Sequence, residues 1–214
     1  MGYDLSGNNP TINEQKPKEM KDILEVWGDD IGWGLDWNKK IPEHIKDKYW
    51  ELEDQHRENN PGIYFRANVW WWRPIWNYVV EFCDDFLTDA DLDKGYSNDS
   101  LGISKTKSKK IAARLRRTAK DGTMDLWVKV HQERYDKAKA HNEIIEKKLH
   151  SLQEQCREAV GDMNIVPADY PQPFKKRWDM LYSQKDWNSS YPCNKDGLLE
   201  FERFCEESGG FIIS

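Results

Sequence analysis

The residues best suited to chemistry lie in one short stretch, YFRANVWWWRPIW, from Tyr64 to Trp76. An arginine guanidinium beside a tryptophan ring can stack on it and still offer hydrogen-bond donors to a carboxylate or phosphate. This combination predicts a binding site for an anionic, nucleotide-like small molecule. The site residues would be Arg66, Asn68, Trp70, Trp71, Trp72 and Arg73.

The same stretch also fits a purely structural role. Burying a large aromatic side chain contributes about 2–3 kcal/mol, so core packing explains several tryptophans without a ligand. Consecutive side chains diverge on both strands and helices, so the three adjacent tryptophans cannot all enter one core. In this interpretation the two arginines form internal ion pairs with Glu81, Asp84 or Asp85. Both interpretations stay open at the level of sequence.

A second cluster is the basic segment KTKSKKIAARLRRTAK, residues 105–120, which contains no acidic residue. Cations gathered on one helix predict a polyanion-binding face. Its members would be Lys109, Lys110, Arg114, Arg116 and Arg117. The alternative is a solvated face that pairs with the acidic segment 84–100. Because the net charge is −6 and no nucleic-acid-binding motif is present, nucleic acid is the less favoured partner.

No catalytic or metal-binding motif accompanies these clusters. The five histidines form no i, i+4 pair, and the four cysteines form no Cys-x-x-Cys pair. The segment DADLDKG is similar to a calcium loop, but Lys94 and Ser100 stand where Gly and Glu are required. We therefore predict no catalytic residue, no metal and no cofactor. The alternative is a small enzyme acting on a nucleotide or another anionic metabolite.

Composition and length narrow the class of protein. The 214 residues are enough for a domain with a real core, and 33% of them are charged, which is typical of helices with solvated faces. No apolar run approaches the 18 or so residues that cross a bilayer. The start, MGYDLSGNNP, lacks the basic and apolar regions of a signal peptide. These features predict a cytoplasmic protein with no membrane partner.

The elements that position the first cluster are a strand and a helix. Alternating side chains predict a strand over 64–69, with Arg66 and Asn68 on one face. The proline that opens 74–87 disfavours helix before it and suits a first helical turn, so we expect a buried helix there. Arg66, Asn68 and Arg73 would then converge at the N-terminus of this helix. Unpaired N–H groups and the helix dipole favour an anion at such a position.

The longest predicted helix covers 123–160 and carries a heptad pattern over about five heptads. The residues at the repeating positions of this pattern form a seam along one side of the helix. The polar residues His131 and Asn142 weaken the N-terminal half of this seam. The helix either protrudes, packs as half of a helical hairpin, or pairs with a second copy, which makes a homodimer through 124–159 one expectation. The seam consists of Met124, Val128, His131, Tyr135, Ala138, Asn142, Ile145, Leu149, Leu152, Cys156 and Ala159.

Together these patterns predict an α+β fold that is mainly helical. A small antiparallel sheet would combine an N-terminal strand, the central strand over 64–69 and the C-terminal FIIS. Residues 1–122 and 161–214 would form one core domain, with 123–160 as the long helix. The segment EVWGDDIGWGLDW would be an irregular loop held by its tryptophans, Trp27, Trp33 and Trp37.

Three motifs resemble those of one protein family: Met-Gly-x-Asp at the start, Tyr-Phe-Arg-x-Asn-Val-Trp-Trp-Trp-Arg-Pro in the middle, and Ser-Gly-Gly-Phe at the end. The family comprises uncharacterised proteins encoded by bacteriophages and prophages. The resemblance lapses between Thr123 and Tyr170, where many relatives carry paired Cys-x-x-Cys motifs that this chain lacks. The matching residues are Gly2, Asp4, Tyr64, Phe65, Arg66, Asn68, Val69, Trp70, Trp71, Trp72, Arg73, Pro74, Ser208, Gly209, Gly210 and Phe211.

The resemblance implies a setting, infection of a bacterial cell, and no particular activity. Combined with the missing catalytic motifs and the long helix, it favours a non-catalytic phage accessory protein. Such a protein would bind a host factor or sequester an anionic, nucleotide-like small molecule, and so act as an inhibitor of host defence. Its expected location is the cytoplasm of the infected bacterium.

Overall fold

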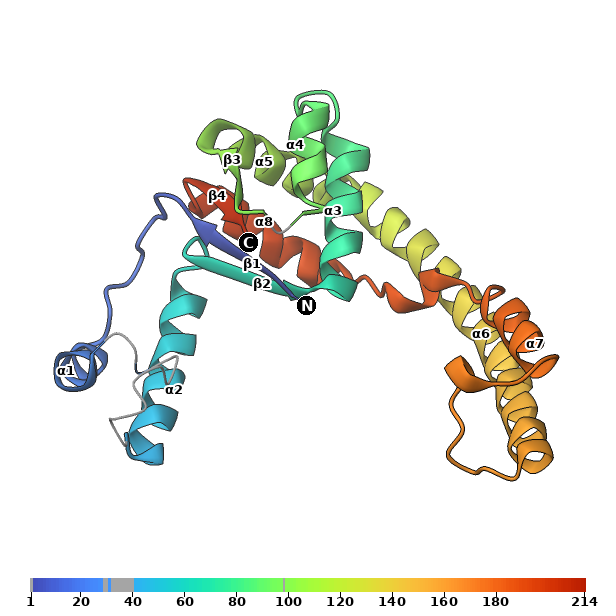
Figure 1. Cartoon of the computed structure of the whole chain (residues 1–214). Coiled ribbons are helices and arrows are strands. Elements are labelled where there is room, and N and C mark those ends of the chain that lie inside the picture. Colours follow the sequence, from blue (N-terminus) through green and yellow to red (C-terminus); the bar gives the residue numbers. More distant parts are fainter. Residues whose placement is uncertain (1, 29–30, 32–40, 98) are drawn as a thin grey trace. The chain divides into compact units, whose positions relative to one another are not determined.

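The computed structural model describes residues 2–28, 31, 41–97 and 99–214 (Figure 1). The chain divides into two compact units: residues Met1–Asp121 with Lys195–Ser214, and residues Gly122–Asn194. The fold is mainly helical with a small antiparallel sheet, as predicted. The segment 161–194, which the sequence placed in the core domain, is grouped with the long helix instead. Trp33 and Trp37 of the predicted irregular loop lie outside the described residues.

The sheet of the first unit has the strand order β2-β1-β4-β3, and all its pairings are antiparallel. Its strands are β1 (Gly2–Gly7), β2 (Tyr64–Asn68), β3 (Leu101–Ser104) and β4 (Gly210–Ile213). Both terminal strands were predicted, and they form the centre of the sheet, where Leu5 lies opposite Ile213. The edge strand β3 was not predicted from the sequence.

Helices cover this sheet and supply most of the core. The first unit contains α1 (Lys18–Trp27), α2 (Glu43–Asn59), α3 (Val69–Cys83), α4 (Asp89–Lys94), α5 (Lys105–Asp121) and α8 (Lys195–Glu207). Large aromatic side chains fill the centre: Trp72, Trp76, Phe201, Phe204 and Phe211 are fully or almost fully buried. A smaller apolar cluster joins α1 and α2 through Met20, Tyr49 and Leu52.

Helix α3 begins at Val69, five residues before the predicted start at Pro74, so that prediction was wrong. The side-chain oxygen of Asn68 accepts hydrogen bonds from the backbone N–H groups of Trp70 and Trp71, at 3.0 and 3.1 Å. Asparagine is among the best N-cap residues. Pro74 therefore lies inside the helix, where it removes one backbone donor. The cap and the burial of Trp72 on the same helix outweigh that loss.

The second unit is built on α6 (Thr123–Val160), the predicted long helix. The 3₁₀ helix η2 (Pro167–Asp169), helix α7 (Phe174–Tyr182) and the 3₁₀ helix η3 (Trp187–Ser190) follow it, and both α7 and η3 pack against α6. The seam positions from Ala138 to Cys156 are buried, so this part of the seam is already covered within one chain. A homodimer through 124–159 stays a prediction.

Candidate functional site

The six predicted ligand-binding residues lie at the junction of β2 and α3. Arg66 is exposed, and its Nε lies 3.5 Å from a carboxylate oxygen of Asp4 across the β1–β2 pair. Asn68 occupies the N-terminal N–H groups of α3 with its own side chain. Because the helix starts at Val69, Arg73 lies one turn inside it. The predicted anion position at the helix N-terminus is thus filled by the protein itself.

The three adjacent tryptophans point in different directions, as their spacing requires. Trp72 is fully buried, stacks between Tyr3 and Trp76, and donates from Nε1 to the carbonyl oxygen of Gly95 at 2.6 Å. Trp71 is half-buried, whereas the side chain of Trp70 is 45% exposed. One tryptophan therefore belongs to the core, and another covers the surface.

Arg73 is half-buried, and it makes no ion pair within the described part of the chain. Its Nε is buried without a hydrogen-bond acceptor, and its guanidinium carbon lies 6.0 Å from the centre of the Tyr96 ring. None of its three predicted partners, Glu81, Asp84 and Asp85, forms an ion pair with Arg73 in the described ranges, and Asp85 binds Arg114. The charge of Arg73 has no compensating carboxylate among the residues that the structure describes.

Helical spacing puts Trp70, Arg73 and Asn77 on one side of α3. Tyr96 joins them: its hydroxyl donates to the side-chain oxygen of Asn77 at 2.7 Å, and its side chain is 38% exposed. We call these four residues the Trp70 face. The buried Trp72 on the same helix fixes the face to the core of the first unit. The face thus presents two aromatic rings and one cation on a rigid support.

The basic helix α5 is largely paired with acidic residues of its own unit. Arg114 binds both carboxylate oxygens of Asp85, at 2.7 and 2.9 Å, and this hydrogen bonding lowers the pKa of Asp85. Arg116 lies 2.5 Å from Glu202 and 3.1 Å from Glu206, and Lys109 lies 3.6 Å from Glu206. These contacts fit the solvated, ion-paired interpretation of the helix.

Two of the predicted polyanion-binding residues behave differently. Lys110 and Arg117 form no ion pair with any residue in the described ranges, and both line a pocket of about 510 Å³ beside Phe86. The Lys110 ammonium lies 5.6 Å from the centre of the Phe86 ring. Asp85 lines the same pocket, so its carboxylate would repel a bound anion.

Three of the four cysteines do not have the properties of nucleophiles. Burial raises the pKa of Cys83 and that of Cys193 to about 12, and it raises the pKa of Cys205 as well. Their thiols are therefore protonated at neutral pH, and the thiolate is the reactive form. Within the described residues, no group of three or more His, Cys, Asp or Glu side chains could hold a metal ion.

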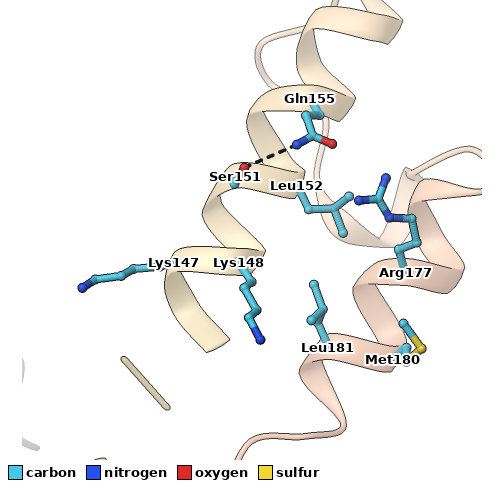
Figure 2. A pocket seen from close by; sticks show the side chains of 8 residues that line it. All are labelled: Lys147, Lys148, Ser151, Leu152, Gln155, Arg177, Met180 and Leu181. Atoms are coloured by element: carbon cyan, nitrogen blue, oxygen red, sulfur yellow. Dashed lines mark hydrogen bonds between the residues drawn. The ribbon is translucent and has the colours of Figure 1, made fainter. Parts of the chain in front are cut away.

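A groove between α6 and α7 in the second unit was not predicted from the sequence (Figure 2). Its volume is about 460 Å³. The sequence signal that could have found it is the pair of lysines at 147 and 148, next to the apolar seam. Its lining residues are Lys147, Lys148, Ser151, Leu152, Gln155, Arg177, Met180 and Leu181.

Two findings bear on the class of protein. Among the helices that the structure describes, none has the length and apolar character needed to cross a membrane. Comparison of the chain with protein-family models, with curated proteins and with solved structures finds no match.

Proposed function

We propose that this protein is a non-catalytic accessory protein that binds a bacterial host protein during phage infection, through the Trp70 face. The proposal rests on two residues of the same helix face. Trp70 is exposed, and the charge of Arg73 lacks a partner in the described residues. Tryptophan, tyrosine and arginine dominate the residues that contribute most to protein–protein binding. A carboxylate on the partner would satisfy the guanidinium of Arg73, and an apolar side chain would cover Trp70.

The exposure of Trp70 and Tyr96 favours a protein over a small molecule as the ligand at this position. Small ligands bind in concave pockets that bury most of their surface. An exposed helix side that carries large aromatic rings is better matched to the surface of another protein.

The proposal of a non-catalytic role rests on the chemistry of the site. Trp70, Arg73, Asn77 and Tyr96 include no group that could act as a nucleophile or general base at neutral pH, because burial raises the pKa of Tyr96 above its usual value. The phage setting rests on the motif resemblance, which includes Trp70 and Arg73. Host-defence inhibition is the role that this combination of setting and binding surface would serve.

The experiment that tests the proposal compares three variants of the full chain in extracts of the host bacterium. Trp70→Ala and Arg73→Ala should lose a co-purifying host protein that the wild type retains. Trp50→Ala is the matched control, because it removes a tryptophan that is 39% exposed on α2, away from the Trp70 face. This variant should retain the host protein.

Two results would overturn the proposal: equal retention by all three variants, or a loss confined to Trp50→Ala. Arg73→Ala should lower the free energy of unfolding by only about 1 kcal/mol, since no ion pair is broken. Native mass spectrometry of the same preparations distinguishes binding of a host protein from binding of a small anion. A small anion that is retained by the wild type and lost from Arg73→Ala would favour sequestration of a nucleotide-like ligand.

A further inference from the structure

The groove between α6 and α7 combines two helix faces of the second unit. Lys148, Ser151, Leu152 and Gln155 recur at helical spacing along one side of α6. Arg177, Met180 and Leu181 do the same on α7. Figure 2 shows the two sets facing each other, with the Arg177 guanidinium directed toward Leu152 and Gln155, and Lys147 pointing away from the others. The groove is therefore a feature of packed helices and not of a loop.

The groove is positively charged, and its charge is not balanced locally. Lys147, Lys148 and Arg177 line it, no carboxylate does, and none of the three cations forms an ion pair with the part of the chain that is described. Three carboxylates of neighbouring turns have other partners. Glu146 pairs with Lys185, Glu154 with Arg157 at 3.2 Å, and Asp179 with Lys175 at 2.5 Å. An anion entering the groove would thus meet cations without displacing an internal carboxylate.

Between the cations lies an apolar floor. Leu152 is buried, Leu181 is half-buried and Met180 is exposed, so the floor offers both a fixed surface and an adaptable thioether side chain. Ser151 accepts a hydrogen bond from the Gln155 amide at 3.4 Å, which leaves its own hydroxyl proton available as a donor. The volume of about 460 Å³ falls within the range of about 300–1,000 Å³ that is common for small-molecule sites.

We propose that this groove binds a small organic anion of about mononucleotide size, with an anionic head group on an apolar or aromatic body. The guanidinium of Arg177 binds the phosphate or carboxylate through two parallel hydrogen bonds, and the Lys148 ammonium adds a second positive charge. The body lies on Leu152, Met180 and Leu181. This site is in the second unit, so it is independent of the Trp70 face.

The test is a calorimetric titration of the full chain with 2-naphthyl phosphate as the probe. Inorganic phosphate supplies the head group alone, and 2-naphthol supplies the body alone. The complete probe should bind at least ten-fold more tightly than either part. Arg177→Gln should weaken its binding at least ten-fold, and Met180→Glu should do the same, because it places a negative charge on the floor. Lys176→Gln is the control, since Lys176 is an exposed cation next to Arg177 that does not line the groove.

Three results would overturn the proposal. The first is no binding of the probe at 1 mM, well above the concentrations at which about micromolar sites fill. The second is equal weakening by Lys176→Gln and Arg177→Gln, which would mean general attraction to surface charge. The third is equal affinity for 2-naphthol and 2-naphthyl phosphate, which would mean an apolar patch without anion recognition. If Arg177→Gln does not fold, Lys148→Gln provides the same test from α6.

Discussion

Gly95 lies so close to the indole of Trp76 that a Cβ atom on Gly95 would stand 1.9 Å from Cε2 of the ring. The carbonyl oxygen of Gly95 also accepts the hydrogen bond from Trp72 Nε1. The turn after α4 is therefore part of the core of the first unit. It also places Tyr96, the next residue, on the Trp70 face.

Gly95→Ala should lower the free energy of unfolding by about 1–3 kcal/mol, because the added methyl group overpacks a filled core. Gly102→Ala is the control, since a Cβ there would meet its nearest atom at an ordinary 3.6 Å. Urea unfolding of both variants measures the difference. Equal stabilities of the two variants would contradict the close packing at Gly95.

Asn68→Ala should lower the free energy of unfolding by about 0.5–2 kcal/mol, because two N–H groups at the start of α3 lose their acceptor. Asn68→Asp should keep most of the stability, since a carboxylate also accepts these bonds and interacts favourably with the helix dipole. Thermal melts of the two variants check this. A larger loss in Asn68→Asp than in Asn68→Ala would show that the side chain does not act as a cap.

Asp91 makes the stability of the first unit depend on pH. Burial raises the pKa of its carboxyl, but hydrogen bonds from Lys107, Thr88 and Lys94 outweigh burial and hold the pKa well below its usual range. A lowered folded-state pKa contributes stability that is complete above the unfolded-state pKa of about 3.9 and is lost as the pH falls below it. At pH 7, Asp91→Asn should therefore cost about 1.5–3 kcal/mol.

The measurement is urea unfolding of the wild type and of Asp91→Asn at pH 7, 5 and 3. The difference between the two proteins should be constant from pH 7 to 5 and smaller at pH 3, because the wild-type carboxylate becomes protonated in the unfolded chain. A difference that stays unchanged at pH 3 would rule out this contribution of Asp91.

Leu149→Ala tests the packing of the second unit. The Leu149 side chain is 2% exposed, so its truncation should cost about 2–5 kcal/mol. Ile144→Ala, on the same helix but 55% exposed, should cost well under 1 kcal/mol. Hydrogen exchange of the amides in 122–194 measures the loss of stability. Light scattering should give the same molecular mass for both variants and for the wild type. A mass that falls only in Leu149→Ala would show that the seam joins two copies.

Deleting 122–194 tests the division of the chain. In the first unit, α5 packs against α8, with the Ser108 hydroxyl bonded to the Cys205 carbonyl oxygen and Arg116 paired with Glu202. This antiparallel pairing brings the end of α5 toward the start of α8, so a short glycine–serine linker can join them. The shortened protein should unfold in one cooperative transition.

Deleting only 125–160 should instead expose the surfaces of α7 and η3 that pack against α6.

The parts of the fold that the sequence predicted correctly are those with a strong local pattern. Alternation over 64–68 identified β2, and the four–three spacing from Ala138 to Cys156 identified the buried side of α6. Both patterns reflect side-chain direction along one element, which depends only on the backbone period. The divergence of the three tryptophans was predicted for the same reason.

The parts that were missed depend on partners distant in the sequence. The proline at 74 suggested a helix start, but the Asn68 cap and the burial of Trp72 set the start earlier. Strand β3 contains four residues, and its pairing with β4 is visible only in the fold. A polar residue at position 142 predicts a weaker seam, yet the Asn142 side-chain amide exchanges two hydrogen bonds with the backbone of Asp186, both at 2.8 Å. The groove at Arg177 needs α7 to meet α6, which no local pattern encodes.

The position of β4 between β1 and β3 has a consequence for synthesis on the ribosome. Strands β1 and β2 can pair once residue 68 has emerged. Strand β4, which joins β1 to β3, consists of residues 210–213 and is therefore made last. The whole of 122–194 is translated before β4 is available. The nascent second unit thus has all its packing partners while the first unit still has an open sheet edge. An unpaired edge of this kind is a template for association with other chains, so the incomplete chain exposes a site for such association until residues 210–213 emerge.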